Sequence, residues 1–354
     1  MLTTVQEPTG SPIYQTEADA PVVAIVGATG AVGIELLRCL EARDFPLRGL
    51  KLLASERSAG RVLRFKGQDI RVETLTEAGF AGVDIALFSA GSGVSKCYAA
   101  MAVRAGAVVV DNSSAFRMDP EVPLVVPEVN GATLRRHRGI VANPNCVAAI
   151  ATVALAPLHR RHPLRRITMA TYQAASGAGA AAMEELRQST AAFLAGETYA
   201  PKVLRHPYAF NLFSHDAAVD PDTGYNGEEL KVVAETRRIL DAETLPIGVT
   251  CIRVPVLRAH AMALTVEFDE IVSPAEARAI LAAAPGLRLV DDRVANHFPM
   301  PSEASGQDDV LVGRIRTDSG DPSGRSLALF VAGDQLLKGA ALNAVQIAEM
   351  LLRL

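Results

Sequence analysis

The feature that most constrains the fold is the run from residue 21 to residue 43, whose pattern predicts a strand, a glycine turn and a helix. "PVVAIVG" (21–27) is short, rich in β-branched residues and ends in glycine, which is typical of a buried strand. "AVGIELLRCLEAR" (31–43) follows with apolar residues at helical spacing. Further strands (51–55, 83–90 and 107–114) alternate with a helix (95–106), and this alternation favours a parallel, doubly wound α/β sheet.

The pattern changes near residue 145, where longer strand-like runs begin. We expect strands at 164–176, 249–258, 260–268, 309–318 and 325–334, and helices near 178–196, 226–241 and 274–284. This mixture predicts an α+β domain with a mixed or antiparallel sheet. The last helix, expected at 337–354, has a strong apolar stripe and is predicted to pack back on the first domain. The predicted domains are residues 21–144, completed by residues 335–354, and residues 145–334.

Composition argues against several classes of protein. The 354 residues suffice for two domains. The net charge of −4, without a Lys/Arg cluster, argues against nucleic-acid and membrane-surface binding, and no apolar run reaches the roughly 18 residues of a membrane span. The four cysteines include no CxxC pair, so we expect no disulfide framework and no structural zinc, and reduced thiols fit a cytoplasmic protein. Residues 1–20 have no basic, apolar leader and are expected to be a disordered extension.

Three glycines connect the first predicted strand to the first helix. In "GATGAVG" they are Gly27, Gly30 and Gly33, spaced G-x-x-G-x-x-G rather than the usual G-x-G-x-x-G. Glycines here let the backbone approach a pyrophosphate, and the helix N-terminus offers free N–H groups. We therefore predict a dinucleotide site; the alternative is a tight turn without a ligand.

The end of the second strand indicates which dinucleotide binds. An NAD site usually has an acid there that holds the ribose 2′-hydroxyl. Here "LLASERSAG" offers Ser55, Arg57 and Ser58, which suit a 2′-phosphate, while Glu56 is expected to face solvent. We therefore predict NADP, with a solvated polar loop as the alternative.

The residues before Cys146 suggest that this cysteine is a nucleophile. "NPN" (143–145) provides a turn and a cap, so Cys146 is expected in the first turn of a helix. The helix dipole there is expected to lower the thiol pKa from about 8.5 toward neutrality. The alternative is a small buried side chain, which is what we expect of Cys39, Cys97 and Cys251.

Arg253 and His260 are candidate partners of that cysteine. Arg253 lies in the apolar strand "VTCIRVPVLR", where a guanidinium is costly to bury unless it binds an anion, so it is a candidate carboxylate clamp. His260 opens the next strand and is a candidate acid or base. A structural ion pair and a satisfied histidine are the alternatives. We assign the other six histidines to a helix end or to polar loops: His159, His162, His137, His206, His215 and His297.

The chain from about residue 21 to its end resembles the aspartate-β-semialdehyde dehydrogenase family. The resemblance rests on long, specific motifs: "GATGAVG", "LASERSAG", "VVVDNSSAFR", "VPLVVPEVN", "NPNC", "TYQAASGAG", "GYNGEELKVVAETRRI", "CIRVPV" followed by His260, "VGRIR" and "KGAALNAVQIAE". It implies an NADP-dependent, reversible conversion of L-4-aspartyl phosphate to L-aspartate 4-semialdehyde and phosphate, on the route to diaminopimelate, lysine, threonine and methionine. Members are dimers or tetramers, so a homodimer or homotetramer is implied.

The resemblance also implies roles for individual residues. Cys146 would form a thioester, His260 would handle the proton, and Gln173 would orient the intermediate. Arg253 would hold the α-carboxylate and Glu228 or Glu229 the α-ammonium. The remaining substrate contacts implied are Arg117 and Lys231 for phosphate, and Asn145. The implied cofactor contacts are Gly27, Thr29, Gly30, Ala31, Val32, Arg57, Ser58, Ser89, Ser176, Gly177 and Gln335, and no metal is implied.

Two positions depart from the family pattern. Val147 stands where members often have Ser or Thr, and Met262 stands where they usually have Glu. We expect Met262 to lower the rate or change the pH profile without abolishing function, because every direct chemical role is still filled.

Three alternatives to this function remain. N-acetyl-glutamyl-phosphate reductase shares the architecture, but acids at 228 and 229 favour a free amine. A malonyl-thioester reductase would need a coenzyme A cleft, which the sequence leaves open. A catalytically inactive binding protein would lack Cys146, Arg253 or His260, and all three are present.

Overall fold

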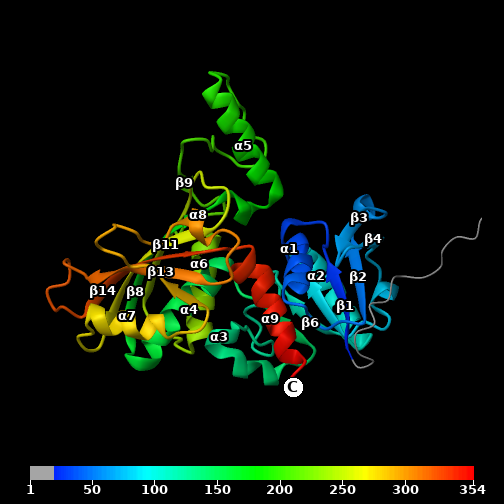
Figure 1. The fold of residues 1–354 in the computed structure, drawn as a ribbon, viewed down its shortest axis with the longest axis horizontal. Helices are drawn as coiled ribbons and strands as arrows, with labels where there is room; N and C mark the ends of the chain where they lie inside the picture. The colour runs from blue at the N-terminus through cyan, green and yellow to red at the C-terminus, as the bar shows by residue number, and fades with distance from the viewer. Residues whose placement is uncertain (1–19) are drawn as a thin grey trace, which may run out of the picture.

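The computed structural model describes residues 20–354 and contains two seven-stranded sheets that lie side by side (Figure 1). The strand order is β3-β4-β2-β1-β5-β6-β7 in the first sheet and β12-β13-β14-β11-β8-β10-β9 in the second. The predicted disordered extension, residues 1–20, lies outside the described residues except for Ala20, which is buried.

The first sheet contains the strands expected from the alternating pattern and three that were not expected, β3, β4 and β7. Its strands are β1 (Val22–Val26), β2 (Gly49–Ala54), β3 (Val62–Phe65), β4 (Gln68–Thr74), β5 (Ile85–Phe88), β6 (Val108–Asp111) and β7 (Ile140–Ala142). All neighbours pair in parallel except β3 with β4. The helices of this part are α1 (Ala31–Ala42), α2 (Ser92–Arg104) and the short α3 (Pro127–Asn130).

Strand β1 is apolar on both faces because helices cover both faces of the sheet. Val23 and Ile25 share a core with α1, whereas Ala24 and Val26 share a core with α2. Successive side chains of a strand point to opposite faces, so this division requires helices on both sides. The predicted doubly wound α/β fold is confirmed.

The second sheet is mixed, as predicted. Its strands are β8 (Leu164–Gln173), β9 (Phe213–Ser214), β10 (Ile247–Arg253), β11 (His260–Phe268), β12 (Leu287–Leu289), β13 (Val310–Thr317) and β14 (Ser326–Gly333). β8 pairs in parallel with β10 and antiparallel with β11. One face shares a large core with α4 (Cys146–Arg161), α6 (Gly227–Leu240) and α7 (Pro274–Ala282).

The C-terminal segment differs from the predicted single helix over 337–354. It begins with a π-helical turn, Leu337–Ala341, and continues as α9 (Leu342–Leu351). Its apolar side chains lie in the core of the first sheet, as expected, and Figure 1 shows α9 running between the two sheets. The π turn passes tightly against α4, since a Cβ on Gly339 would lie 2.8 Å from the Cβ of Cys146. Such turns occur often at functional sites.

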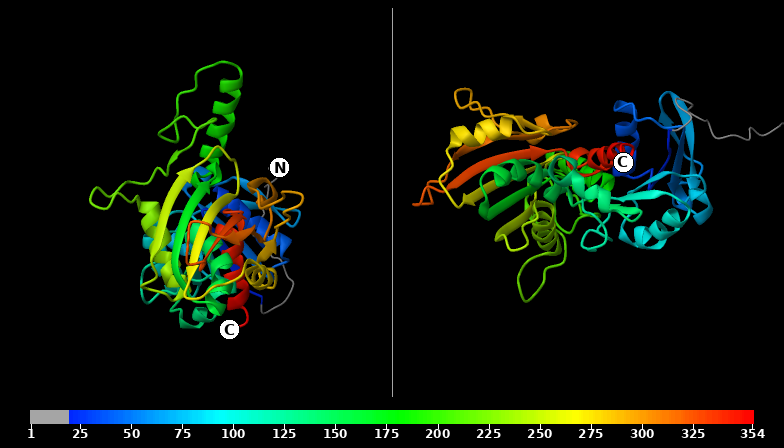
Figure 2. Two further views of the ribbon diagram at one scale, coloured as in Figure 1. Left: turned by 90° about the vertical axis from the view of Figure 1, so that its left-hand side faces the viewer. Right: turned by 90° about the horizontal axis from the view of Figure 1, so that it is seen from below.

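Two further features differ from the sequence-based expectations. Cys97 is exposed rather than part of the core, because α2 turns Ser95, Ala99 and Ala102 inward. The helix α5 (Ala180–Leu194), expected as an ordinary helix, extends away from both sheets in two perpendicular views (Figures 1 and 2). Across residues 20–354, none of the helices has the length and apolar character needed to cross a membrane.

Candidate active site

One cavity of about 470 Å³ collects most of the predicted catalytic residues. We call it the central cavity. It lies where α4 begins and where β8 and β10 end, and the C-terminal π turn closes one side. Its lining comprises Val32, Asn112, Arg117, Pro144, Asn145, Cys146, Gln173, Ser176, Gly177, Ala178, Val203, Leu204, His215, Asp216, Glu228, Arg253, His260, Gln335, Leu336, Gly339 and Ala340.

The sheet topology explains why three of these side chains meet. Gln173 ends β8 and Arg253 ends β10, and the two residues are paired in the parallel register. His260 begins the antiparallel neighbour β11 at the same edge of the sheet. Because the ends of parallel strands share an edge, residues 80 positions apart in sequence lie side by side there.

Cys146 is the first residue of α4, as predicted. The side chain of Asn145 caps the helix by accepting from the backbone N–H groups of Val147 and Ala148, at 2.9 and 3.3 Å. A cap of this kind fixes the first turn, so the Cys146 side chain is held at the cavity wall. The thiol is partly buried against Gly339.

The expectation that the helix dipole lowers the thiol pKa is wrong for this structure. Burial raises the pKa of Cys146 to about 12, and the nearby Glu228 carboxylate raises it further, while Arg117 and Arg253 oppose both. Removal from water disfavours the thiolate more than one helix N-terminus favours it. The free enzyme therefore carries a thiol at neutral pH.

His260 is fully buried and presents one nitrogen to the cavity. Its Nδ1 accepts from the Ala174 N–H at 3.0 Å, whereas its Nε2 has no partner in the structure. A neutral ring that accepts at Nδ1 carries its proton on Nε2, so the cavity side of His260 is a hydrogen-bond donor. Burial, with Arg253 and His215 adding to it, holds the pKa of His260 well below its ordinary value.

Arg253 is buried and already has a protein carboxylate beside it. Its Nε donates to Asp216 Oδ1 at 3.1 Å, its Nη1 lies 3.4 Å from the Ala174 carbonyl, and its Nη2 lies 2.8 Å from His215 Nε2. Burial opposes ionisation of Asp216, but Arg253 and His215 outweigh it and hold the pKa of this carboxyl low. Asp216 was not predicted as a site residue, and His215 was assigned to a polar loop.

Gln173 and Glu228 lie close together in the lining of the cavity. Glu228 Oε1 accepts from Asn145 Nδ2 at 2.8 Å and lies 3.4 Å from Gln173 Nε2. Glu229 does not line the cavity, because its two oxygens accept from the backbone N–H groups of Asn226 and Cys251. Glu228 and Glu229 were both candidates for binding the α-ammonium, and of the two Glu228 faces the cavity. Lys231 is exposed and does not line it.

A buried acid that was not predicted, Glu235, holds two of the predicted residues. Its Oε2 accepts from the Asn145 N–H at 2.5 Å, and its Oε1 accepts from Arg117 Nη1 at 3.2 Å. Arg117 also donates to the carbonyls of Asn143 and Asn112. Burial raises the pKa of Glu235 despite these donors. Glu235 therefore fixes Arg117 against the start of α4.

Gly177 has no side chain and so leaves room where the side chains of His260 and Arg253 converge. A Cβ at this position would lie 2.9 Å from His260 Cε1, 3.0 Å from His260 Nε2 and 3.0 Å from Arg253 Nη1. Ser176 beside it accepts from the Gln335 side chain, whose other end accepts from the Ala259 N–H at 2.9 Å. The segment 174–177 is therefore packed directly against the residues before and after the start of β11.

The glycine loop follows the C-terminal end of β1. Among residues 27–33, only Val32 lines the central cavity. Gly27 has φ of +85°, and a Cβ there would lie 2.8 Å from the Ser89 carbonyl; a Cβ on Gly33 would overlap the Gly27 carbonyl. The turn therefore needs both glycines. Gly30 takes the N-cap position of α1, ahead of Ala31.

Three hydroxyls and a guanidinium surround this loop. Thr29 Oγ1 donates to Ser58 Oγ at 3.2 Å, the Ser89 hydroxyl is buried without a partner in the structure, and Arg57 is exposed beside Ser58. Glu56 is exposed, as expected. These groups can receive a phosphorylated nucleotide that lies across the start of α1.

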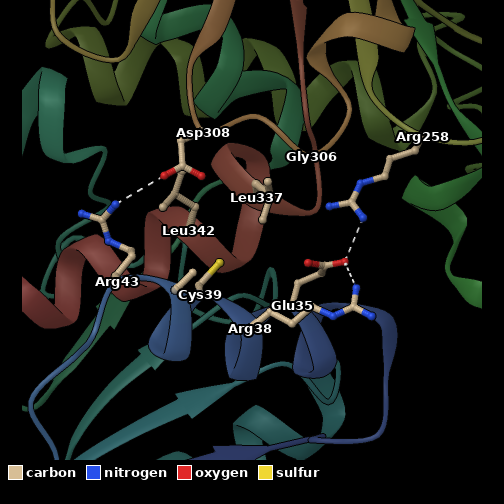
Figure 3. A pocket seen from close by; sticks show the side chains of 10 residues that line it. Glu35, Arg38, Cys39, Arg43, Arg258, Gly306, Asp308, Leu337 and Leu342 are labelled. Carbon is tan, nitrogen blue, oxygen red and sulfur yellow. Dashed lines mark hydrogen bonds and ion pairs between the residues drawn. The ribbon is translucent and has the colours of Figure 1, made fainter. Parts of the chain in front are cut away.

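A second cavity of about 590 Å³ lies between α1 and the second sheet (Figure 3). Glu35 of α1 accepts from Arg38 at 3.0 Å and from Arg258 at 2.8 Å, and Arg43 contacts Asp308 at 3.4 Å. Arg258 also donates to the buried Asp334 at 2.6 Å. Within residues 20–354, no group of three or more His, Cys, Asp or Glu side chains is arranged to hold a metal ion.

Two family models match the chain. Residues 22–137 match the semialdehyde dehydrogenase NAD binding domain, and residues 155–338 match the semialdehyde dehydrogenase dimerisation domain. The aspartate-semialdehyde dehydrogenase of Synechocystis is 53% identical over 93% of this chain and 96% of its own length. This chain belongs to the aspartate-semialdehyde dehydrogenase family.

Other members of the family agree in sequence and fold. The aspartate-semialdehyde dehydrogenase of Bacillus subtilis is 44% identical over 94% of this chain and 97% of its own length. The crystal structure of aspartate semialdehyde dehydrogenase II from Vibrio cholerae superimposes with a TM-score of 0.91 at 42% identity, covering 95% of this chain and 99% of that one. The similarity therefore extends over both sheets.

Proposed function

We propose that the chain is an aspartate-semialdehyde dehydrogenase that converts L-4-aspartyl phosphate and NADPH reversibly into L-aspartate 4-semialdehyde, phosphate and NADP⁺. The observation that carries the proposal is the convergence of a helix-start cysteine, a buried arginine, a buried histidine and a glutamine at one cavity beside a nucleotide-binding sheet. A second structure of the V. cholerae enzyme is described as complexed with ASA, which supports a small substrate of this kind.

The chemistry divides among the cavity residues. Cys146 Sγ adds to the aldehyde carbon, and a bound nicotinamide would accept the hydride from that carbon to leave a thioester. Phosphate then attacks the thioester carbonyl carbon and displaces the Cys146 thiolate, which gives the acyl phosphate. His260 donates from Nε2 to the oxygen on the reacting carbon as negative charge develops there. Gln173 orients the acyl group. Because the thiol pKa is raised, Cys146 loses its proton as it attacks, and the aldehyde oxygen gains one, so that the adduct is a neutral hemithioacetal.

The charged ends of the substrate have separate partners. Arg253 is proposed to bind the α-carboxylate and Glu228 the α-ammonium, with Asn145 beside it. The phosphate is assigned to Arg117, which lines the cavity, and to Lys231, which is exposed at the start of α6. To bind phosphate, Arg117 would give up one of its hydrogen bonds to a protein acceptor and donate to a phosphate oxygen instead. Glu229 caps α6, so its proposed role is structural rather than ammonium binding.

The cofactor is proposed to be NADP. Gly27 to Val32 and Ser89 would contact the pyrophosphate and its surroundings, and Arg57 and Ser58 the 2′-phosphate. The nicotinamide end is assigned to Ser176, Gly177 and Gln335, which line the central cavity. The acid that follows β2, Glu56, is exposed, whereas an NAD enzyme would use an acid at this point to hold the ribose.

The biological setting is also inferred. We propose a homodimer or homotetramer assembled through the part that matches the dimerisation domain. The reaction would serve diaminopimelate, lysine, threonine and methionine biosynthesis in the cytoplasm. Residues 21–144 with 335–354 would form the nucleotide domain, and residues 145–334 the catalytic one.

The test is NADP reduction by the purified chain with L-aspartate 4-semialdehyde, with and without phosphate. Phosphate-dependent NADPH formation is expected, because the thioester needs a phosphate acceptor to turn over. Folded protein that binds NADPH but shows no turnover would contradict the proposal. Replacing NADP with NAD in the same assay measures the preference that Arg57 and Ser58 are proposed to create.

A further inference from the structure

Two side-chain nitrogen atoms face each other at close distance in the central cavity. His215 Nε2 lies 2.8 Å from Arg253 Nη2, a hydrogen-bonding distance. The other ring nitrogen of His215, Nδ1, accepts from the backbone N–H of Ala217 at 3.1 Å. His215 follows the short strand β9 and lines the cavity together with Arg253.

No neutral form of the imidazole satisfies both contacts. A neutral ring has one donor and one acceptor nitrogen. If Nδ1 accepts from Ala217, the proton is on Nε2 and points at the guanidinium N–H. If Nε2 accepts from Arg253, the proton is on Nδ1 and points at the Ala217 N–H. Burial, with Arg253 adding to it, lowers the pKa of His215, so the ring is neutral at pH 7.

An acceptor placed against both groups removes this conflict. With Nδ1 held by Ala217, Nε2–H of His215 and Nη2–H of Arg253 are two donors that converge on the cavity. Such a pair matches one oxygen of a carboxylate. Asp216 occupies only the Nε edge of the guanidinium, so the Nη2 edge stays available to a ligand.

We propose that His215 is a second donor to the α-carboxylate of the substrate, so that Arg253 and His215 together select amino-acid aldehydes. This inference rests on the proposed function. The placement agrees with the reacting end of the site, because Arg253 Nη1 and His260 Nε2 both face the space over Gly177. A carboxylate on the His215 side leaves the aldehyde carbon on the Cys146 side.

The experiment compares L-aspartate 4-semialdehyde with 3-aminopropanal, which is the same molecule without its α-carboxylate. His215→Leu removes the donor, and His215→Gln restores an N–H near the position of Nε2. His206→Asn is the control, because His206 is exposed and does not line the cavity. NADPH binding by each variant, followed by fluorescence, reports an intact fold and nucleotide site.

His215→Leu is expected to lower kcat/KM for the semialdehyde by about 10- to 100-fold, the effect of one hydrogen bond to a charged group, and to leave 3-aminopropanal unchanged. His215→Gln should recover at least part of the loss, and His206→Asn should change neither substrate. Where 3-aminopropanal turns over too slowly, its Ki as a competitor of the semialdehyde serves instead.

Equal losses for both substrates would show a merely structural role and overturn the inference, as would unchanged kinetics in His215→Leu. Failure of the unmodified chain to use the semialdehyde would instead overturn the proposed function itself.

Discussion

Arg258 donates to Glu35 at 2.8 Å, so the loop between β10 and β11 of the second sheet is held by α1, the first helix of the nucleotide-binding part (Figure 3). The same guanidinium donates to Asp334, which is fully buried. The next residue, Ala259, has a backbone φ of +71°, which is unfavourable for any residue other than glycine. His260 follows directly. The bridge therefore holds a strained backbone in place beside the proposed catalytic histidine.

Arg258→Met should impair turnover through this bridge. We expect kcat to fall by about tenfold, because a small displacement of His260 is enough to misalign it. Arg258→Lys, which can keep one of the two ion pairs, should lose less. In the double variant with Glu35→Gln, the two effects should be less than additive, by about 1 kcal/mol in transition-state free energy. Fully additive losses would show that Glu35 and Arg258 act independently.

Gly177→Ala should damage the site without damaging the fold. The added methyl group would lie 3.0 Å or less from both His260 and Arg253. We expect kcat/KM for the semialdehyde to fall by about 10- to 100-fold. The matched control is Gly248→Ala in β10, where a Cβ meets no atom within 4 Å. Equal activity of the two variants would contradict the proposed positions of the reacting groups.

Cys146→Ala should keep the fold and NADPH binding but lose turnover by more than about 10³-fold, because no other group can form the thioester. Cys97→Ala is the control, since Cys97 is exposed on α2 and outside both cavities. The measurement is the steady-state rate, with mass spectrometry to detect the acyl-enzyme. A variant with most of its rate would refute a cysteine nucleophile.

The raised pKa of Cys146 predicts a specific pH dependence. A thiol with a pKa of about 12 is protonated through the neutral range, so its thiolate fraction should grow about tenfold per pH unit. Alkylation of Cys146 by iodoacetamide in the free enzyme should therefore accelerate steadily from pH 7 to pH 9. Peptide mapping separates this site from the exposed Cys97. A plateau below pH 8 would mean that the helix N-terminus outweighs burial after all.

Met262 stands where the family pattern has glutamate, and restoring that glutamate should destabilise the fold. It is fully buried in the core beneath the second sheet, opposite Thr171 of β8 and Val331 of β14. Met262→Glu should lower the free energy of unfolding by about 3–5 kcal/mol at pH 7, whereas Met262→Leu should cost less than about 1.5 kcal/mol. Burial raises the pKa of such a carboxyl, so the loss should shrink as the pH falls. Urea denaturation at pH 5 and pH 7 measures both effects.

The backbone architecture could be predicted because its signals are local. The alternation of β1, α1 and β2 shows in the spacing of apolar residues, and the cap at Asn145 shows in three letters of sequence. The hairpin of β3 and β4 was missed because half of its side chains are exposed and polar, so neither strand has a continuous apolar run.

The site was predictable only where a motif marks it. His215, Asp216 and Glu235 act through partners 37 to 118 positions away, and no regular spacing in the sequence relates them to these partners. The predicted direction of the Cys146 pKa shift was wrong for a similar reason. A helix start can be recognised locally, but the burial by the π turn and the negative charge of Glu228, which both raise the thiol pKa, come from residues far away in sequence.

The return of α9 to the first sheet has a consequence for synthesis on the ribosome. The buried residues of segment 337–348, among them Leu342, Val345 and Ile347, complete a core whose remaining members lie before residue 142. A nascent chain therefore exposes one face of its first sheet until this segment has been synthesised, although N-terminal domains usually fold first. The second sheet, whose strands all lie between residues 164 and 333, can form earlier. The first sheet would then complete its core after the second, and a chain that stopped before residue 337 would leave the nucleotide-binding part unfinished.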